Sequence, residues 1–153
     1  MCSQSDLKLS LSKFQLCAFV SSNSFDAKTY EDSAGVYFSS IGVSGLHRDS
    51  LELSSKDEVD VLDFGSSLKW GKGDVNVSWN HLYSKLSKPI RRTKNYYNQH
   101  YLTGSRFYIQ SLDFNYLLNY HHFFGEIALD REFDFAMLFG MSGSISDLID
   151  YKV

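Results

Sequence analysis

A long stretch near the C-terminal end of the chain, residues 106–146, contains no proline and places apolar residues at every second position. From Tyr108 to Tyr120 one set of alternate residues is mainly aliphatic or aromatic, while the other includes Ser111, Asp113 and Asn115. A period of two is the spacing of a β-strand with one apolar and one polar face. The stretch therefore predicts long antiparallel strands. It leaves open whether their apolar face meets a protein core or lipid.

The composition supports strands and limits the classes of function. Aromatic residues make up 16% of the 153 residues, and there is a single proline. Both features favour strands over helices. The net charge of -3 argues against broad electrostatic binding to nucleic acid. The sequence contains no run of about 18 apolar residues, so it predicts no membrane-spanning helix. The N-terminal residues lack the apolar segment of a secretory signal. If the protein works outside the cytoplasm, we therefore expect the chain to be a fragment or to lack its natural N-terminus.

The same alternation recurs along the chain and predicts a series of hairpins. Two long polar connections, at about 23–61 and 84–104, separate them, and residues 49–62 of the first favour a short helix. The short turns are expected at Ser12-Lys13, 71–74, His121-His122, Asp130–Glu132 and Asp147–Asp150. The sequence thus predicts an all-β fold, an antiparallel up-and-down meander of about seven or eight strands. Residues 1–153 would form one partial barrel domain.

The order of short and long connections bears on the direction of the apolar face. Short turns at one end and long loops at the other are typical of outer-membrane barrels, although soluble barrels show this asymmetry too. A membrane barrel turns its apolar face outward to lipid, whereas a soluble barrel buries it. Tyrosines near the strand ends would suit an interfacial aromatic girdle, which favours lipid. On this interpretation the lipid-facing residues are Leu112, Phe114, Tyr116, Phe135, Met137 and Phe139. The lumen would hold a polar network of Asp113, Asn115, Glu126 and Asp134.

Several short strings occur in an order that resembles a known family. They are 42-GVSGLHRDSLELSSKDEV-59, 64-FGSSLKW-70, 123-FFGEIALD-130 and 140-GMSGSIS-146. They resemble Bacteroidetes-type outer-membrane proteins whose full-length members carry a helix-hairpin-helix (ComEA-like) region before a large β-barrel. The resemblance extends from about Phe14 to Ile145. It implies an internal barrel fragment without the helix-hairpin-helix region, located in the bacterial outer membrane.

The resemblance also marks a loop motif. In this chain its members are Gly45, His47, Arg48 and Glu52, which we expect to brace the barrel from an outer loop. A second loop segment, 85-KLSKPIRRTK-94 with the tyrosines that follow it, mixes cations with aromatic rings. Such a mixture can bind single-stranded nucleic acid or an anionic polysaccharide. The favoured interpretation is a solvated outer loop near lipid headgroups.

No motif in the sequence indicates catalysis. Cys2 and Cys17 form no metal-binding pattern, and the five histidines show neither HxH nor HExxH spacing. Nucleophile elbows, P-loops and dinucleotide fingerprints are also lacking. Asp113 and Glu126 are expected to belong to a structural network rather than to act as a catalytic pair. We therefore expect no enzymatic activity, no cofactor and no metal.

The sequence predicts a non-enzymatic component of an outer-membrane β-barrel, acting as a scaffold, a pore or a partner-binding element. Its expected partners are outer-membrane lipid and an unidentified protein, with no nucleic acid bound by this chain. One alternative is a soluble antiparallel β-barrel that binds a small apolar ligand inside. A weaker alternative is a component of DNA uptake that acts through a helix-hairpin-helix region outside this chain. Exposure of the apolar residues at 112–116 and 135–139 would discriminate between the first two.

Overall fold

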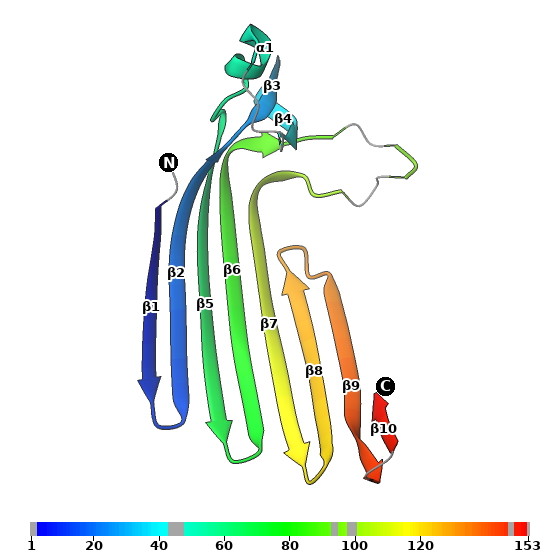
Figure 1. Cartoon of the computed structure of the whole chain (residues 1–153). Coiled ribbons are helices and arrows are strands. Elements are labelled where there is room, and N and C mark those ends of the chain that lie inside the picture. The colour runs from blue at the N-terminus through cyan, green and yellow to red at the C-terminus, as the bar shows by residue number, and fades with distance from the viewer. Residues whose placement is uncertain (1–2, 43–47, 93–94, 98–100, 147–148, 153) are drawn as a thin grey trace. The chain divides into compact units, whose positions relative to one another are not determined.

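The computed structural model describes residues 3–42, 48–92, 95–97, 101–146 and 149–152. Almost all of the regular structure is β-strand, in one sheet with the order β1-β2-β5-β6-β7-β8-β9-β10 (Figure 1). β3 and β4 pair with each other, and β4 also pairs with β6. The elements are β1 Ser3–Leu11, β2 Phe14–Phe25, β3 Ala27–Asp32, β4 Gly35–Ile41, α1 Ser50–Ser54, β5 Val59–Lys72, β6 Val75–Ile90, β7 Gly104–Leu118, β8 His121–Asp130, β9 Phe135–Ser146 and β10 Ile149–Lys152. The predicted all-β antiparallel meander with a short loop helix is confirmed, although the described residues form ten strands where about seven or eight were expected.

Tight turns join most sequential strands. Ser12 and Gly73 adopt positive φ angles of 31° and 59° in the turns before β2 and β6. The turn predicted at His121-His122 is wrong, because both histidines belong to β8 and the reversal lies at Asn119 and Tyr120. Asn119 has a φ of 53°, a left-handed conformation that asparagine tolerates better than most residues. The asparagine therefore marks the turn that the histidine pair was expected to form.

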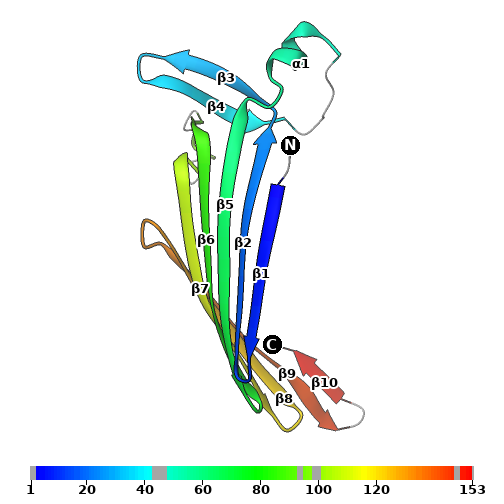
Figure 2. The same ribbon diagram turned by 90° about the vertical axis from the view of Figure 1, so that its left-hand side faces the viewer.

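Both expected long connections contain more strand than predicted. Within 23–61, the hairpin of β3 and β4 precedes α1, and Figure 2 shows this hairpin turning away from the ends of β2 and β5. A register shift between Ala27 and Thr29 interrupts the pairing, so the sequence alternation is too short and irregular to predict a strand. Within 84–104, β6 continues to Ile90 and β7 starts at Gly104.

The chain divides into two compact units that share the long strands. One comprises 1–5, 20–63 and 84–107, and the other 6–19, 64–83 and 108–153. Here they are called the hairpin unit and the sheet unit. Within the described residues, no helix has the length and hydropathy needed to cross a membrane.

The hairpin unit contains a small hydrophobic core. Its buried residues are Ala27, Phe38, Val59, Val61 and Ile90, with Leu86 and Phe107 packed against them. Phe38 is fully buried and pairs in parallel with Ile90, which fixes β4 beside the end of β6. The buried hydrophobic residues in the described part of the chain all belong to this unit. The described residues of the sheet unit form no comparable core.

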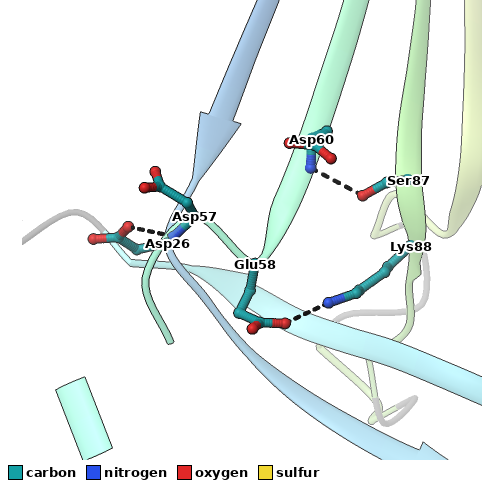
Figure 3. A network of polar contacts seen from close by, with 6 residues as sticks. All are labelled: Asp26, Asp57, Glu58, Asp60, Ser87 and Lys88. Carbon is teal, nitrogen blue, oxygen red and sulfur yellow. Dashed lines mark hydrogen bonds and ion pairs between the residues drawn. The ribbon is translucent and has the colours of Figure 1, made fainter. Parts of the chain in front are cut away.

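Polar contacts attach the chain after α1 to the strands of the hairpin unit (Figure 3). The backbone N–H of Asp57 donates to Asp26 Oδ1 at 3.0 Å, between β2 and β3. Glu58 forms an ion pair with Lys88 of β6, and the backbone N–H of Asp60 donates to Ser87 Oγ at 2.9 Å. These contacts set the start of β5 against β6 and hold Val59 over the core.

Phe38→Ala should lower the free energy of unfolding by about 3 kcal/mol, because it removes the largest buried side chain of the core and leaves a cavity. Urea unfolding of the chain refolded in detergent micelles measures this change. Phe133→Ala is the control, because the Phe133 side chain is 84% exposed in the turn before β9 and should contribute little. An equal loss in the two variants would contradict the assignment of the core.

Candidate functional site

The register of β7, β8 and β9 gives the sheet unit two chemically different faces. Leu112 lies opposite Ile127, which lies opposite Met137, and residues directly opposite in antiparallel strands share a face. The same register and alternation align a set of ten residues, here called the apolar face. They are Leu112, Phe114, Tyr116, Phe123, Ile127, Leu129, Phe135, Met137, Phe139 and Met141.

All six residues predicted to face lipid belong to the apolar face and are exposed. Their exposed fractions lie between 37% for Phe114 and Tyr116 and 66% for Phe135. The other three are Leu112, Met137 and Phe139. Thus they do not line an enclosed interior within the described structure. The apolar face is open to whatever medium surrounds it.

A glycine in β8 organises the aromatic packing on this face. Gly125 lies between Phe114 of β7 and Phe139 of β9, whose ring centroids are 6.2 Å apart. A Cβ atom at Gly125 would come within 2.6 Å of both rings. The missing side chain therefore lets the two rings cover the backbone of β8 and meet over it.

The opposite side, here called the polar face, carries a chain of hydrogen bonds across three strands. Ser67 of β5 donates its hydroxyl to Asn80 Oδ1 at 2.7 Å. The amide of Asn80, in β6, donates from Nδ2 to Asp113 Oδ2 at 2.8 Å and to Ser111 Oγ at 3.3 Å in β7. Asn80 is thus the centre of the network, a role that was not predicted from the sequence. Its role could have been predicted from its position between Trp79 and His81, because a strand turns alternate residues to opposite faces and Asn80 is the polar one.

Asp113 and Asn115, both predicted network residues, do face this side of β7. Asn115 Oδ1 lies 3.0 Å from His122 Nε2, a contact that exists because His122 is in β8 and not in the preceding turn. Asp113 lies directly opposite Glu126. Like charges directly opposite each other are unfavourable, but Glu126 is exposed, so water screens the repulsion.

The polar face is also hollowed. An open hollow of about 440 Å³ is lined by residues of β7 to β10, among them Asp113, Glu126 and Lys152. Its lining residues are Asp113, Phe114, Asn115, His122, Phe124, Gly125, Glu126, Leu138, Ser142 and Lys152. Among the described residues, no three Asp, Glu, His or Cys side chains are grouped so as to hold a metal ion. The hollow can hold water, and its side chains can bind polar groups or ions of opposite charge.

Asp134 does not join the other predicted network residues. It lies in the turn between β8 and β9, because β9 begins only at Phe135. Its N–H donates to Asp130 Oδ1 at 3.0 Å, and its carbonyl accepts from the Asp130 N–H at 3.1 Å. Asp134 therefore closes a turn rather than contributing to the polar face.

The predicted outer-loop motif is described only in part. Gly45 and His47 lie outside the described residues. Glu52 accepts the N–H of Arg48 at 2.7 Å, and its own N–H donates to the N-cap residue Asp49 at 2.7 Å. The Arg48 guanidinium also lies 3.7 Å from Glu52. The structure thus brings Arg48 and Glu52 together at the N-terminus of α1, where the Asp49 side chain caps the helix by accepting the Glu52 N–H.

Comparisons with known proteins do not identify a family. No family model matches the chain, and no curated protein or solved structure is significantly similar to it. The similarity to helix-hairpin-helix outer-membrane proteins remains a prediction that rests on the strings quoted above.

Asn80→Asp should lower the free energy of unfolding by about 2 kcal/mol, because it replaces the amide that donates to Asp113 with a second carboxylate. The exchange Asn80→Asp with Asp113→Asn should recover most of the loss, since the donor and acceptor are then reversed. Urea unfolding in micelles measures both variants. Ser78→Ala, two residues away on β6, is the control. If the double variant is no more stable than Asn80→Asp alone, the hydrogen bond is not the source of the stability.

Proposed function

We propose that this chain is the membrane-embedded sheet of a bacterial outer-membrane β-barrel, with the apolar face toward lipid and the polar face toward the lumen. The observation that carries the proposal is the apolar face itself. Its six predicted members share one side of β7, β8 and β9 and are all exposed. Contiguous apolar surface of this kind marks contact with lipid or with another apolar surface.

The distribution of buried residues supports lipid as the medium. A soluble sheet would cover such a face with a second layer, whose packed side chains would be buried. In the described part of the chain, the five buried hydrophobic residues all lie in the hairpin unit. No described segment therefore covers the apolar face, and lipid chains would complete its burial.

The opposite face supports a lumen. Outer-membrane barrels place polar side chains inside, where water hydrates them. The polar face has the hydrogen-bond chain through Asn80 and the hollow beside Asp113 and Glu126. Carboxylates, amides and a lysine on a hollowed surface suit a water-filled or plugged interior and would be costly against lipid.

Strand length and connections are consistent with this orientation. β5 to β9 contain between 10 and 16 residues, whereas strands of soluble proteins most often have about 5–6. A tilted membrane strand takes about 9–11 residues. The role that follows is structural, as a scaffold, a pore wall or a surface for a protein partner, with no enzymatic step.

Met137 and Leu138 provide a matched test, because they are neighbours in β9 with nearly equal exposed fractions, 58% and 60%. They lie on opposite faces, since Met137 pairs with Ile127 and Leu138 with Glu126. Met137→Arg should destabilise the chain folded in phospholipid bilayers by about 2–4 kcal/mol, the usual cost of arginine on a lipid face. Leu138→Arg should have little effect, because the new cation meets water and Glu126.

Urea titration in bilayers measures both variants against the unchanged chain. Equal losses would contradict the proposal, and a larger loss for Leu138→Arg would show that the sheet faces lipid with its other side. A chain that is a folded, monodisperse monomer in water without detergent would also contradict it. That result would favour a soluble barrel with a small apolar ligand inside.

A further inference from the structure

The β3–β4 hairpin carries a pair of tyrosines on one face. Tyr30 and Tyr37 lie directly opposite each other across the two strands. Their rings stack with centroids 5.7 Å apart and an interplanar angle of 25°. Phe38 and Ala27 are buried in the core of the hairpin unit, whereas Tyr30 is 41% exposed. The hairpin thus anchors itself through its buried residues and presents a partly exposed aromatic surface.

Cations from two separate segments border this aromatic surface. Lys28 of β3 places its Nζ 5.8 Å from the centroid of the Tyr30 ring. Arg91, the residue after β6, places its Cζ 5.4 Å from the centroid of the Tyr37 ring. Cations at these distances are attracted to the ring faces, so one cation lies over each ring of the stacked pair.

A second arginine extends the border. The Arg92 side chain donates from Nε to the carbonyl of Ser39 at 2.9 Å and lies 4.8 Å from the centroid of Tyr101. The N–H of Arg91 donates to the carbonyl of Phe38 at 2.9 Å. The backbone of Arg91 and the side chain of Arg92 are therefore attached to β4, and the Arg92 side chain would lose little conformational freedom when a ligand binds.

The charges of this surface do not cancel. Lys28, Arg91 and Arg92 are cations, and among the described residues Asp32 forms an ion pair with Arg91 at 3.0 Å. All of these side chains are exposed, in a chain whose net charge is -3. The surface therefore concentrates positive charge beside aromatic rings, against the sign of the whole molecule. We call these residues, with Tyr30, Tyr37 and Tyr101, the hairpin patch.

We propose that the hairpin patch binds an anionic saccharide, a sugar that carries a carboxylate or phosphate group. The exposed parts of Tyr30 and Tyr101 offer apolar surface for the C–H groups of a sugar ring. Guanidinium groups match carboxylate and phosphate geometry through paired N–H donors. The inference goes beyond the proposed role in the membrane, because it depends only on contacts within the hairpin unit.

Single-stranded nucleic acid fits this surface less well. Such ligands need cations spaced along their backbone and free ring faces for successive bases. Here Tyr30 and Tyr37 stack on each other, and one of the three cations is paired with Asp32. A compact ligand with one or two anionic groups uses the hairpin patch more completely than a long polyanion does.

The test measures binding by calorimetry to the full chain, refolded in a detergent without a sugar headgroup. The probes are tetragalacturonate, its methyl-esterified neutral form and an oligothymidylate with the same number of charges. Vesicles with and without lipopolysaccharide form a further arm that distinguishes a membrane-held saccharide from a free one. We expect tetragalacturonate or the lipopolysaccharide vesicles to bind, and the neutral ester to bind about tenfold more weakly than its acid.

Arg91→Gln with Arg92→Gln should weaken the binding at least about tenfold. Lys28→Gln with Tyr30→Leu tests the same surface without disturbing the contacts that the arginines make with β4. Lys69→Gln with Lys72→Gln removes the same charge from exposed positions of β5 and should leave the affinity unchanged.

Four results would overturn the proposal. The first is equal binding of the neutral ester, and the second is an equal loss in the β5 control variant. The third is tighter binding of oligothymidylate through the same residues, which would assign the surface to nucleic acid. Absence of binding to every saccharide probe would overturn it as well.

Discussion

An apolar sheet face that no described part of the chain covers is the constraint on which the rest of this structure depends. Folding must offset a conformational entropy cost of about 1–2 kcal/mol for each ordered residue, and hydrogen bonds alone contribute modestly to that balance. Among the described residues the buried hydrophobic core consists of five side chains, all in the hairpin unit. The sheet unit therefore needs an external apolar medium to bury Leu112, Met137 and their neighbours. In the proposed membrane location, lipid chains supply such a medium without a second protein layer.

The two faces are consequences of one register. The pairing that aligns Phe114, Gly125 and Phe139 on one side also brings Asp113 opposite Glu126 on the other. A shift by one residue would exchange the faces and expose carboxylates where the rings now lie. Contacts on both sides resist such a shift. The rings meet over Gly125, and Asn80 connects Asp113 to Ser67.

Alternation predicted much of this arrangement because a strand with two different faces leaves a regular trace in its sequence. It identified the face of Leu112 to Tyr116 and the polar position of Asp113. The alternation of apolar and polar residues failed to predict strands and turns where it is short or irregular. The β3–β4 hairpin is brief and interrupted by a register shift, and His121-His122 belongs to β8 while Asn119 makes the turn. Contacts between strands, such as that of Asn80 with Asp113, depend on register, which a single sequence does not encode locally.

The direction of the apolar face can be measured most directly through the two tryptophans of the chain. Asn80 and Ser67 point to the polar face, so Trp79 and Trp70, at odd spacings from them, point to the apolar face. The measurement is fluorescence quenching of the chain folded in bilayers whose acyl chains carry bromine, compared with quenching by acrylamide in the water. An outward apolar face predicts strong quenching by the brominated lipid and weak quenching by acrylamide. Strong quenching by acrylamide with none by the brominated lipid would contradict it.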